Sequence, residues 1–101
     1  MKPDIDMEAV IDGKRYRVST AELLASDAFW DGRNWERKGR NTFLYRTQNG
    51  RYFKLLMTTW PGERGHLEAL EPDVAKQLWE TLPEQTMTIE EAFPGTEIED
   101  A

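Results

Sequence analysis

Residues 41–60, NTFLYRTQNGRYFKLLMTTW, constrain the fold most, because Asn49-Gly50 separates two runs of β-branched, aromatic and aliphatic residues. Asn-Gly accepts two positive φ angles, so it is typical of a two-residue type I′ turn between antiparallel strands. That turn would set Gln48 opposite Arg51 and fix the register outward from there. One face would then carry Phe43, Tyr45, Tyr52, Leu56 and Trp60, and the other Leu44, Phe53, Leu55 and Met57. Two apolar faces predict a hairpin central to its sheet, with other elements packed on both sides or with one aromatic face left partly open.

A second hairpin is expected over residues 5–19 around Asp12-Gly13, another pair that favours a two-residue turn. Polar and apolar residues alternate regularly here, and Glu8 stands opposite Arg17 on the polar face. The apolar face would enter the core through Met7, Ala9, Ile11, Tyr16 and Val18. This hairpin is therefore predicted to have one buried face and one solvated face.

A capping box follows the first hairpin, because Ser19 and Glu22 have the spacing at which each side chain caps the other residue's backbone. This pattern predicts a short helix that passes through Leu23 and Leu24. The helix is expected to end at about residue 25 or 26, where the sequence becomes irregular.

The stretch 26–40, SDAFWDGRNWERKGR, has two glycines and two tryptophans and is expected to be a long loop. Long ordered loops are often where binding occurs. Alternatively the loop folds back and its aromatic residues fill the core, since Phe29, Trp30 and Trp35 would be costly to leave in water. The sequence leaves both interpretations open.

The C-terminal third is expected to contain one more strand and two helical segments. Residues 66–70 alternate as a third antiparallel strand, and Pro72 fits the first turn of a helix that reaches residue 82. Thr88 and Glu91 form a second capping box, which predicts a helical turn over residues 89–93. The apolar stripe of the longer helix would consist of Val74, Ala75, Leu78, Trp79 and Leu82.

Together these elements predict an α+β fold, with a small antiparallel sheet of two β-hairpins, a meander of about five strands, and one short and one longer amphipathic helix. Residues 1–95 are expected to form a single compact domain, followed by an acidic, frayed tail over residues 96–101. There is no cysteine and no long apolar run, which favours a cytoplasmic location without membrane association.

The sequence contains no pattern that indicates catalysis or a cofactor. His66 is the only histidine, and neither Ser19 nor Ser26 lies in a nucleophile motif. Glu63, His66 and Glu68 lack the spacing of a known zinc motif and could supply only a loose, oxygen-rich site. We therefore expect a protein that is not an enzyme and that has no metal or cofactor.

Charge is distributed unevenly along the chain. Residues 1–13 carry a net charge of −3, residues 14–64 carry +6, and residues 65–101 carry −9, within a total of −6. Such asymmetry is typical of a cationic surface that meets an anionic partner, of an acidic surface that meets a basic partner, or of two lobes that attract each other.

One group of basic and aromatic residues is the candidate binding surface. Its members are Arg33, Trp35, Arg37, Lys38, Arg40, Tyr45, Arg46, Arg51, Tyr52 and Lys54. Trp, Tyr and Arg dominate the hot spots of protein interfaces, which makes an unidentified protein the first expected partner. The alternative is a single-stranded nucleic acid, whose bases would stack on the aromatic rings, although a sequence pI near 4.8 argues against it.

The hairpin carries the pattern Tyr-Arg-Thr-x-x-Gly-x-Tyr-Phe over residues 45–53. With TAE at 20–22, GRN at 39–41, WPGE at 60–63, the predicted helix over 72–82 and EAFP at 91–94, the chain resembles small uncharacterised accessory proteins of bacterial plasmids, integrative elements and prophages. The resemblance covers about residues 16–95. It implies a bacterial accessory protein of a mobile element, which could act on a host protein such as a defence factor.

Overall fold

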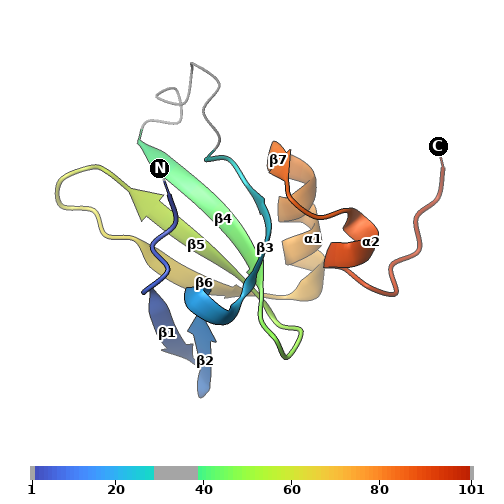
Figure 1. Ribbon diagram of the computed structural model, residues 1–101, viewed down its shortest axis with the longest axis horizontal. Helices are drawn as coiled ribbons and strands as arrows, with labels where there is room; N and C mark the ends of the chain where they lie inside the picture. Colours follow the sequence, from blue (N-terminus) through green and yellow to red (C-terminus); the bar gives the residue numbers. More distant parts are fainter. Residues whose placement is uncertain (1, 29–38, 101) are drawn as a thin grey trace.

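The computed structural model describes residues 2–28 and 39–100. They form seven strands, a single 3₁₀ turn (η1) and two α-helices (Figure 1). In chain order the elements are β1 (Glu8–Ile11), β2 (Lys14–Arg17), η1 (Val18–Thr20), β3 (Glu22–Ser26), β4 (Arg40–Arg46), β5 (Tyr52–Thr58), β6 (His66–Leu70), α1 (Pro72–Thr81), β7 (Glu84–Gln85) and α2 (Ile89–Ala92).

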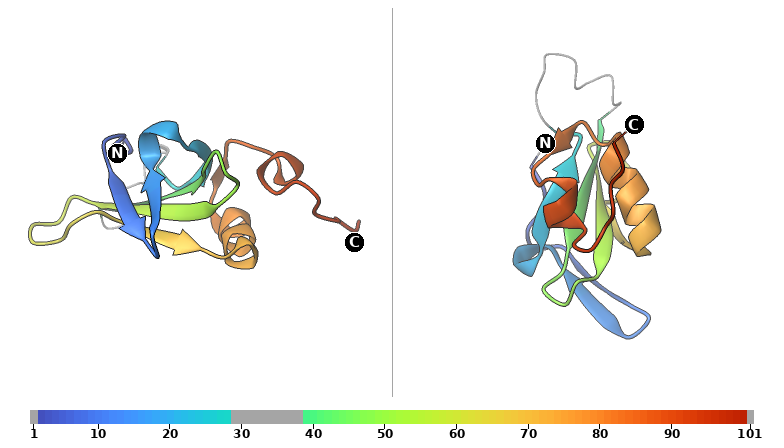
Figure 2. Two further views of the ribbon diagram at one scale, coloured as in Figure 1. Left: turned by 90° about the horizontal axis from the view of Figure 1, so that it is seen from below. Right: turned by 90° about the vertical axis from the view of Figure 1, so that its right-hand side faces the viewer.

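An antiparallel sheet in the order β6-β5-β4-β3-β7 is the centre of the fold, and β1 and β2 form a separate hairpin. The β1-β2 hairpin packs on one face of this sheet and α1 on the other (Figure 2). The predicted α+β class and the central position of the β4-β5 hairpin are confirmed. No helix within residues 2–28 and 39–100 is long and apolar enough to cross a membrane.

The turn of the β4-β5 hairpin differs from the prediction. Arg46 pairs with Tyr52, and the Thr47 amide donates to the Arg51 carbonyl at 2.7 Å, so three residues lie in the loop instead of two. The Gly50 amide donates to the Thr47 carbonyl at 3.0 Å, and Gly50 alone in this loop has a positive φ, of 82°. These features indicate a type I turn closed by a left-handed glycine. The predicted pairing of Gln48 with Arg51 is therefore wrong by one position.

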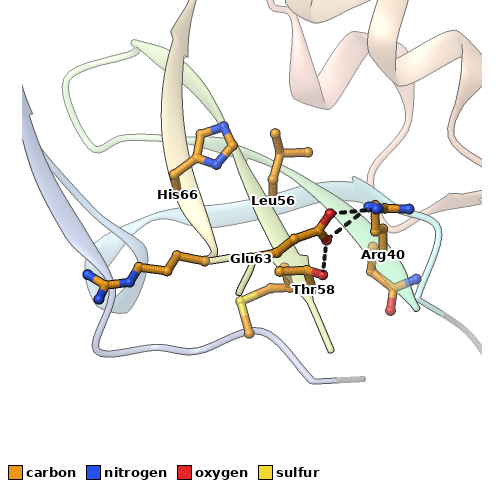
Figure 3. A pocket seen from close by; sticks show the side chains of 8 residues that line it. Arg40, Leu56, Thr58, Glu63 and His66 are labelled. Atoms are coloured by element: carbon orange, nitrogen blue, oxygen red, sulfur yellow. Dashed lines mark hydrogen bonds and ion pairs between the residues drawn. The ribbon is translucent and has the colours of Figure 1, made fainter. Parts of the chain in front are cut away.

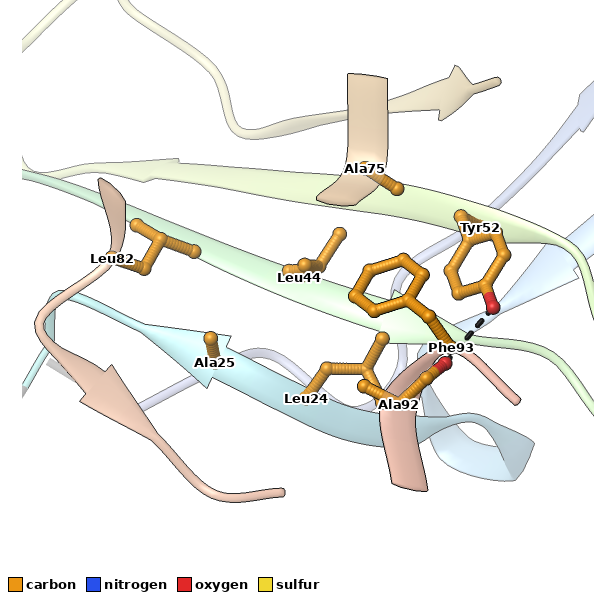
Figure 4. Packing of buried hydrophobic residues seen from close by; sticks show 8 residues of the cluster. All are labelled: Leu24, Ala25, Leu44, Tyr52, Ala75, Leu82, Ala92 and Phe93. Atoms are coloured by element: carbon orange, nitrogen blue, oxygen red, sulfur yellow. Dashed lines mark hydrogen bonds between the residues drawn. The ribbon is translucent and has the colours of Figure 1, made fainter. Parts of the chain in front are cut away.

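This shift moves β5 side chains to the opposite face of the sheet, since side chains alternate along a strand. Phe53 now faces the same side as Tyr45, and Tyr52 leaves that side. Two buried clusters result, one on each face. The hairpin-side core contains Tyr16, Val18, Phe43, Tyr45, Phe53, Leu55 and Leu67. The helix-side core contains Leu24, Ala25, Leu44, Tyr52, Ala75, Leu82, Ala92 and Phe93 (Figure 4).

The first hairpin forms as predicted. Asp12 and Gly13 both have positive φ, of 51° and 76°, as a two-residue primed turn requires. Glu8 pairs with Arg17, and Nε of Arg17 lies 3.2 Å from a carboxylate oxygen of Glu8. The predicted apolar face packs into the hairpin-side core through Met7, Ala9, Ile11, Tyr16 and Val18.

The predicted short helix after Ser19 is wrong, because this segment is strand β3. Glu22 pairs with Arg46 across the sheet instead of capping Ser19, and Leu24 and Ala25 are completely buried between β4 and β7. A cap contributes only about 1 kcal/mol, whereas full burial of one leucine contributes about 1.5 to 3 kcal/mol before its ladder hydrogen bonds are counted. Tertiary pairing therefore outweighs the local helix signal.

Strand β6 and both predicted C-terminal helices are confirmed, with one change in α1. Pro72 begins α1, and the Thr88–Glu91 capping box begins α2. Val74 is 49% exposed and does not belong to the buried stripe, which consists of Ala75, Leu78, Trp79 and Leu82. Strand β7 was not predicted, since two polar residues carry no strand pattern.

Candidate functional site

The predicted binding surface is only partly within the described residues. Arg33, Trp35, Arg37 and Lys38 lie outside them, as do Phe29 and Trp30 of the predicted loop. The six remaining candidates are Arg40, Tyr45, Arg46, Arg51, Tyr52 and Lys54. They all come from β4, β5 and the turn between them.

The two candidate tyrosines are buried on opposite faces of the sheet. Tyr45 is 4% exposed and stacks on Phe53 in the hairpin-side core, with ring centroids 5.2 Å apart. Tyr52 is 7% exposed and stacks on Phe93 at 4.8 Å, and its hydroxyl donates to the Ala92 carbonyl at 2.9 Å. Burial raises the pKa of Tyr45 to about 12. Neither ring is presented to solvent.

Arg46 connects the sheet to the C-terminal helix α2. Its guanidinium donates to the carbonyl oxygens of Glu91 at 2.6 Å and Ala92 at 2.9 Å, and its other terminal nitrogen lies 3.4 Å from Glu22. The Ala92 carbonyl thus accepts hydrogen bonds from both Arg46 and Tyr52. The Arg46 side chain is only 17% exposed, so Arg46 is a structural residue that holds α2 to the sheet.

Lys54 and Arg51 complete the candidates near the turn. Lys54 makes an ion pair with Glu68 on β6 at 3.2 Å, and His66 contacts the same carboxylate at 2.9 Å. The hydrogen bond from His66, followed by that from Lys54, lowers the pKa of Glu68. Arg51 is exposed, and its side chain makes no hydrogen bond or ion pair with the described part of the chain. The structure therefore does not bring these candidates together into one open surface.

A hollow of about 340 Å³ lies at the other end of the hairpin, and we call it the open-end hollow (Figure 3). Three strands and the turn between β5 and β6 contribute to it. Its lining residues are Arg40, Asn41, Leu56, Met57, Thr58, Glu63, Arg64 and His66. Of these, only Arg40 belongs to the surface predicted from the sequence.

Arg40, Thr58 and Glu63 form a hydrogen-bonded side of the open-end hollow. The Arg40 guanidinium holds the Glu63 carboxylate through two contacts, of 3.1 and 2.5 Å, and the Thr58 hydroxyl donates to the same carboxylate at 2.6 Å. Arg40, and then Thr58, lower the pKa of Glu63, while this pairing raises the pKa of Arg40. The Arg40 guanidinium also lies 5.7 Å from the ring centre of Trp60.

The other side of the open-end hollow is apolar at its base and charged at its rim. Leu56 and Met57 are half-buried, whereas Arg64 and His66 are exposed. The β5-β6 turn approaches β5 closely, since a Cβ atom at Gly65 would lie 2.9 Å from the Leu56 carbonyl oxygen. Trp60, beside the hollow, is 49% exposed.

Sequence reasoning missed the open-end hollow because its residues are scattered over positions 40–66. The available signal was Trp60 next to the Pro61-Gly62 turn and two charged residues. Within the residues that the structure describes, no group of three or more His, Asp or Glu side chains could hold a metal ion. The open-end hollow therefore suits non-covalent binding, through its apolar base, the charged side chains that line it and the exposed indole of Trp60 beside it.

The comparisons with known proteins add no family to this description. No protein-family model, curated protein or solved structure matches the chain. The resemblance to accessory proteins of mobile elements therefore stays a prediction from the residue pattern. What is said below about function depends on the geometry of the described residues.

Proposed function

We propose that this is a non-enzymatic, protein-binding accessory or regulatory protein whose open-end hollow is the contact site. One observation carries the proposal: Arg40 and Arg64 line a hollow whose base is apolar, and the half-exposed Trp60 ring lies against Arg40 beside it. Tryptophan, tyrosine and arginine are the residues most enriched in the hot spots of protein interfaces, which lie in pockets from which the surrounding contacts exclude water.

The size of the open-end hollow is compatible with one side chain of a protein partner. Ligand pockets run from about 300 to 1,000 Å³, and a hollow of about 340 Å³ is at the lower limit of that range. A hollow of this size would hold one anchoring side chain that belongs to a larger surface of the partner protein. An aliphatic or aromatic anchor would contact Leu56 and Met57, and an adjacent carboxylate would face Arg64.

The charges of the open-end hollow support the same partner chemistry. Glu63 already neutralises Arg40, because both oxygens of its carboxylate are bonded to that guanidinium. Arg64 makes no ion pair with any residue that the structure describes, so its charge is available to a partner. An acidic residue next to the anchor would pair with it and would give the complex its orientation.

The alternative, a single-stranded nucleic-acid binder, loses two of its expected base-stacking rings. Tyr45 and Tyr52 are core residues, and Arg46 and Lys54 are held by partners within the fold. Stacking on exposed rings supplies about 1 to 3 kcal/mol per base in such proteins. The described residues therefore favour a protein partner. The resemblance to mobile-element proteins makes a host protein, such as a defence factor, the class of partner that we expect.

Affinity capture from a bacterial lysate tests the proposal with a matched pair of variants. Arg64→Glu changes the rim of the open-end hollow, and Arg51→Glu makes the same charge change at an exposed arginine beside the opposite turn. We expect a protein that the wild type and Arg51→Glu retain equally and that Arg64→Glu loses by at least about tenfold, since a hot-spot contact contributes about 2 kcal/mol. Equal retention by both variants would place the contact elsewhere, and retention of no specific protein would count against the proposal.

A further inference from the structure

A second hollow, at the turn end of the β4-β5 hairpin, has a different chemical character. It has a volume of about 330 Å³ and lies between the outer face of β2, η1 and the β4-β5 turn. Its lining residues are Arg15, Arg17, Thr20, Thr47, Gln48 and Asn49, and we call it the turn-end hollow. We propose that it binds the phosphate group of a small phosphorylated molecule. This inference is independent of the protein-binding proposal, because the two hollows share no residue.

Strand alternation places the two arginines. Tyr16 points into the hairpin-side core, so its neighbours Arg15 and Arg17 lie together on the outer face of β2. The β1-β2 hairpin and the β4-β5 turn lie at the same end of the molecule (Figure 2, right). The β4-β5 turn thus lies beside the β1-β2 hairpin, although the two are distant in the sequence.

The donors in the turn-end hollow suit an anion. Although the protein carries a net charge of −6, no carboxylate lines this hollow. The side chains of Arg15, Thr20, Gln48 and Asn49 make no hydrogen bond or ion pair among the residues that the structure describes. Two guanidiniums, two amides and two hydroxyls therefore surround one space of about 330 Å³.

Two of these groups are partly engaged. Nε of Arg17 contacts Glu8 at 3.2 Å, which offsets part of its charge and leaves its terminal nitrogens for a ligand. The Thr47 hydroxyl accepts from the Arg51 amide at 3.0 Å and keeps its own proton to donate. Arg15 is thus the main cationic group of the turn-end hollow.

A phosphate group matches this donor set better than a carboxylate does. A phosphate monoester has three terminal acceptor oxygens, and a guanidinium can bind two of them side by side. Donors that come from three separate elements suit a tetrahedral group more than a planar one. The remaining volume would accommodate a small organic part, at the lower limit of ligand pockets.

An NMR titration with inorganic phosphate tests this site at constant ionic strength, with sodium chloride as the balancing salt. We expect saturable shifts of the side-chain amide signals of Gln48 and Asn49 and of the Nε–H signal of Arg15. In Arg15→Gln the dissociation constant for phosphate should rise about tenfold, as loss of a charged hydrogen bond predicts. Arg51→Gln, the matched control, carries the same charge change outside the turn-end hollow and should leave the dissociation constant unchanged.

Two results would overturn the inference. The first is a set of shifts that grow linearly with phosphate and spread over Arg51, Arg64 and Lys76 as well. The second is equal weakening in Arg15→Gln and Arg51→Gln, which would show a response to net charge alone. Arg15 has no partner among the described side chains, so its replacement should leave the fold intact, and dispersed amide signals would verify this.

Discussion

The two halves of the β4-β5 hairpin both carry arginine and aromatic side chains, but in different surroundings. In the turn half, Tyr45 and Tyr52 are buried, and Arg46 donates to two carbonyl oxygens next to α2. In the open half, Trp60 is half exposed and Arg40 pairs with a surface carboxylate. The turn half consists of Tyr45, Arg46, Tyr52 and Lys54, and the open half of Arg40, Met57, Trp60 and Glu63.

The difference follows from what covers each half of the sheet. Near the turn, the β1-β2 hairpin packs on one face and α1 and α2 on the other, so aromatic rings there enter two cores. The open half continues away from α1 and α2 into the β5-β6 turn (Figure 1), with the partly buried Met57 packed against the hairpin-side core. A basic and aromatic composition therefore does not by itself indicate a binding surface, because the same residue types can be used to hold the fold together.

The largest expected difference between the halves is in core packing. Phe53→Ala, beside Tyr45, should lower the free energy of unfolding by about 3 to 5 kcal/mol, since it empties a completely buried site. Met57→Ala, in the half-buried open half, should cost less than about 2 kcal/mol. Urea unfolding of both variants measures the difference, and equal costs would show that the open half is as closely packed as the turn half.

The next effect concerns the arginines. Arg46→Ala should lower the free energy of unfolding by about 1.5 to 3 kcal/mol, because it removes charged hydrogen bonds to the Glu91 and Ala92 carbonyls. Arg51→Ala is the matched control and should change stability by no more than about 0.5 kcal/mol. If the loss in Arg46→Ala were as small as in the control, Arg46 would be a surface residue available for binding.

A smaller effect is expected for the Tyr52 hydroxyl. Tyr52→Phe should cost about 0.5 to 1.5 kcal/mol, towards the lower end, because the Ala92 carbonyl keeps its hydrogen bond from Arg46. Tyr45→Phe should cost less, since the Tyr45 hydroxyl makes no hydrogen bond with the described residues. Combining Tyr52→Phe with Arg46→Ala should cost more than the sum of the two changes, and strict additivity would contradict the shared acceptor.

The smallest expected effect is the pH-dependent contribution of Glu63, in the open half, to the stability of the protein. The pKa of Glu63 is lowered in the folded protein, so its contribution to stability is present above its unfolded pKa and is lost as pH falls through the folded pKa. Arg40→Gln should raise the pKa of Glu63 towards its ordinary value, as followed by NMR of its carboxyl carbon. Arg64→Gln should raise it less, and an equal rise in both variants would contradict the specific pairing of Arg40 with Glu63.

Local signals predicted much of the fold. The Asp12-Gly13 turn, the α1 stripe and the Thr88 cap each depend on neighbouring residues, and the structure contains all three, with Val74 outside the stripe. Two of the predictions were wrong, one within the β4-β5 turn itself and one where a partner distant in the sequence decides. The Thr47 hydroxyl and the left-handed Gly50 favour a three-residue loop over the expected two-residue turn. Burial of β3 between β4 and β7 outweighs the cap at Ser19.

The candidate site was less predictable than the fold. Periodicity tells which side chains share a face, but a one-residue change in register exchanged the faces predicted for Tyr52 and Phe53. Both hollows are formed by elements far apart in the sequence, with the open-end hollow taking residues from 40 to 66 and the turn-end hollow from 15 to 49. No spacing rule indicates such groups before the register and the packing of the first hairpin are known.

Nitration of the tyrosines by tetranitromethane tests most directly whether the turn half belongs to the fold. Mass spectrometry of peptides would compare Tyr45 and Tyr52 in the folded protein and in denaturant, where both should react. With 4% and 7% of their surfaces exposed, both should remain unmodified in the folded protein, and burial that raises the pKa of Tyr45 to about 12 further suppresses its reactive phenolate. Nitration of either ring in the folded protein at the rate seen in denaturant would contradict this prediction. The turn half would then again be a candidate binding surface.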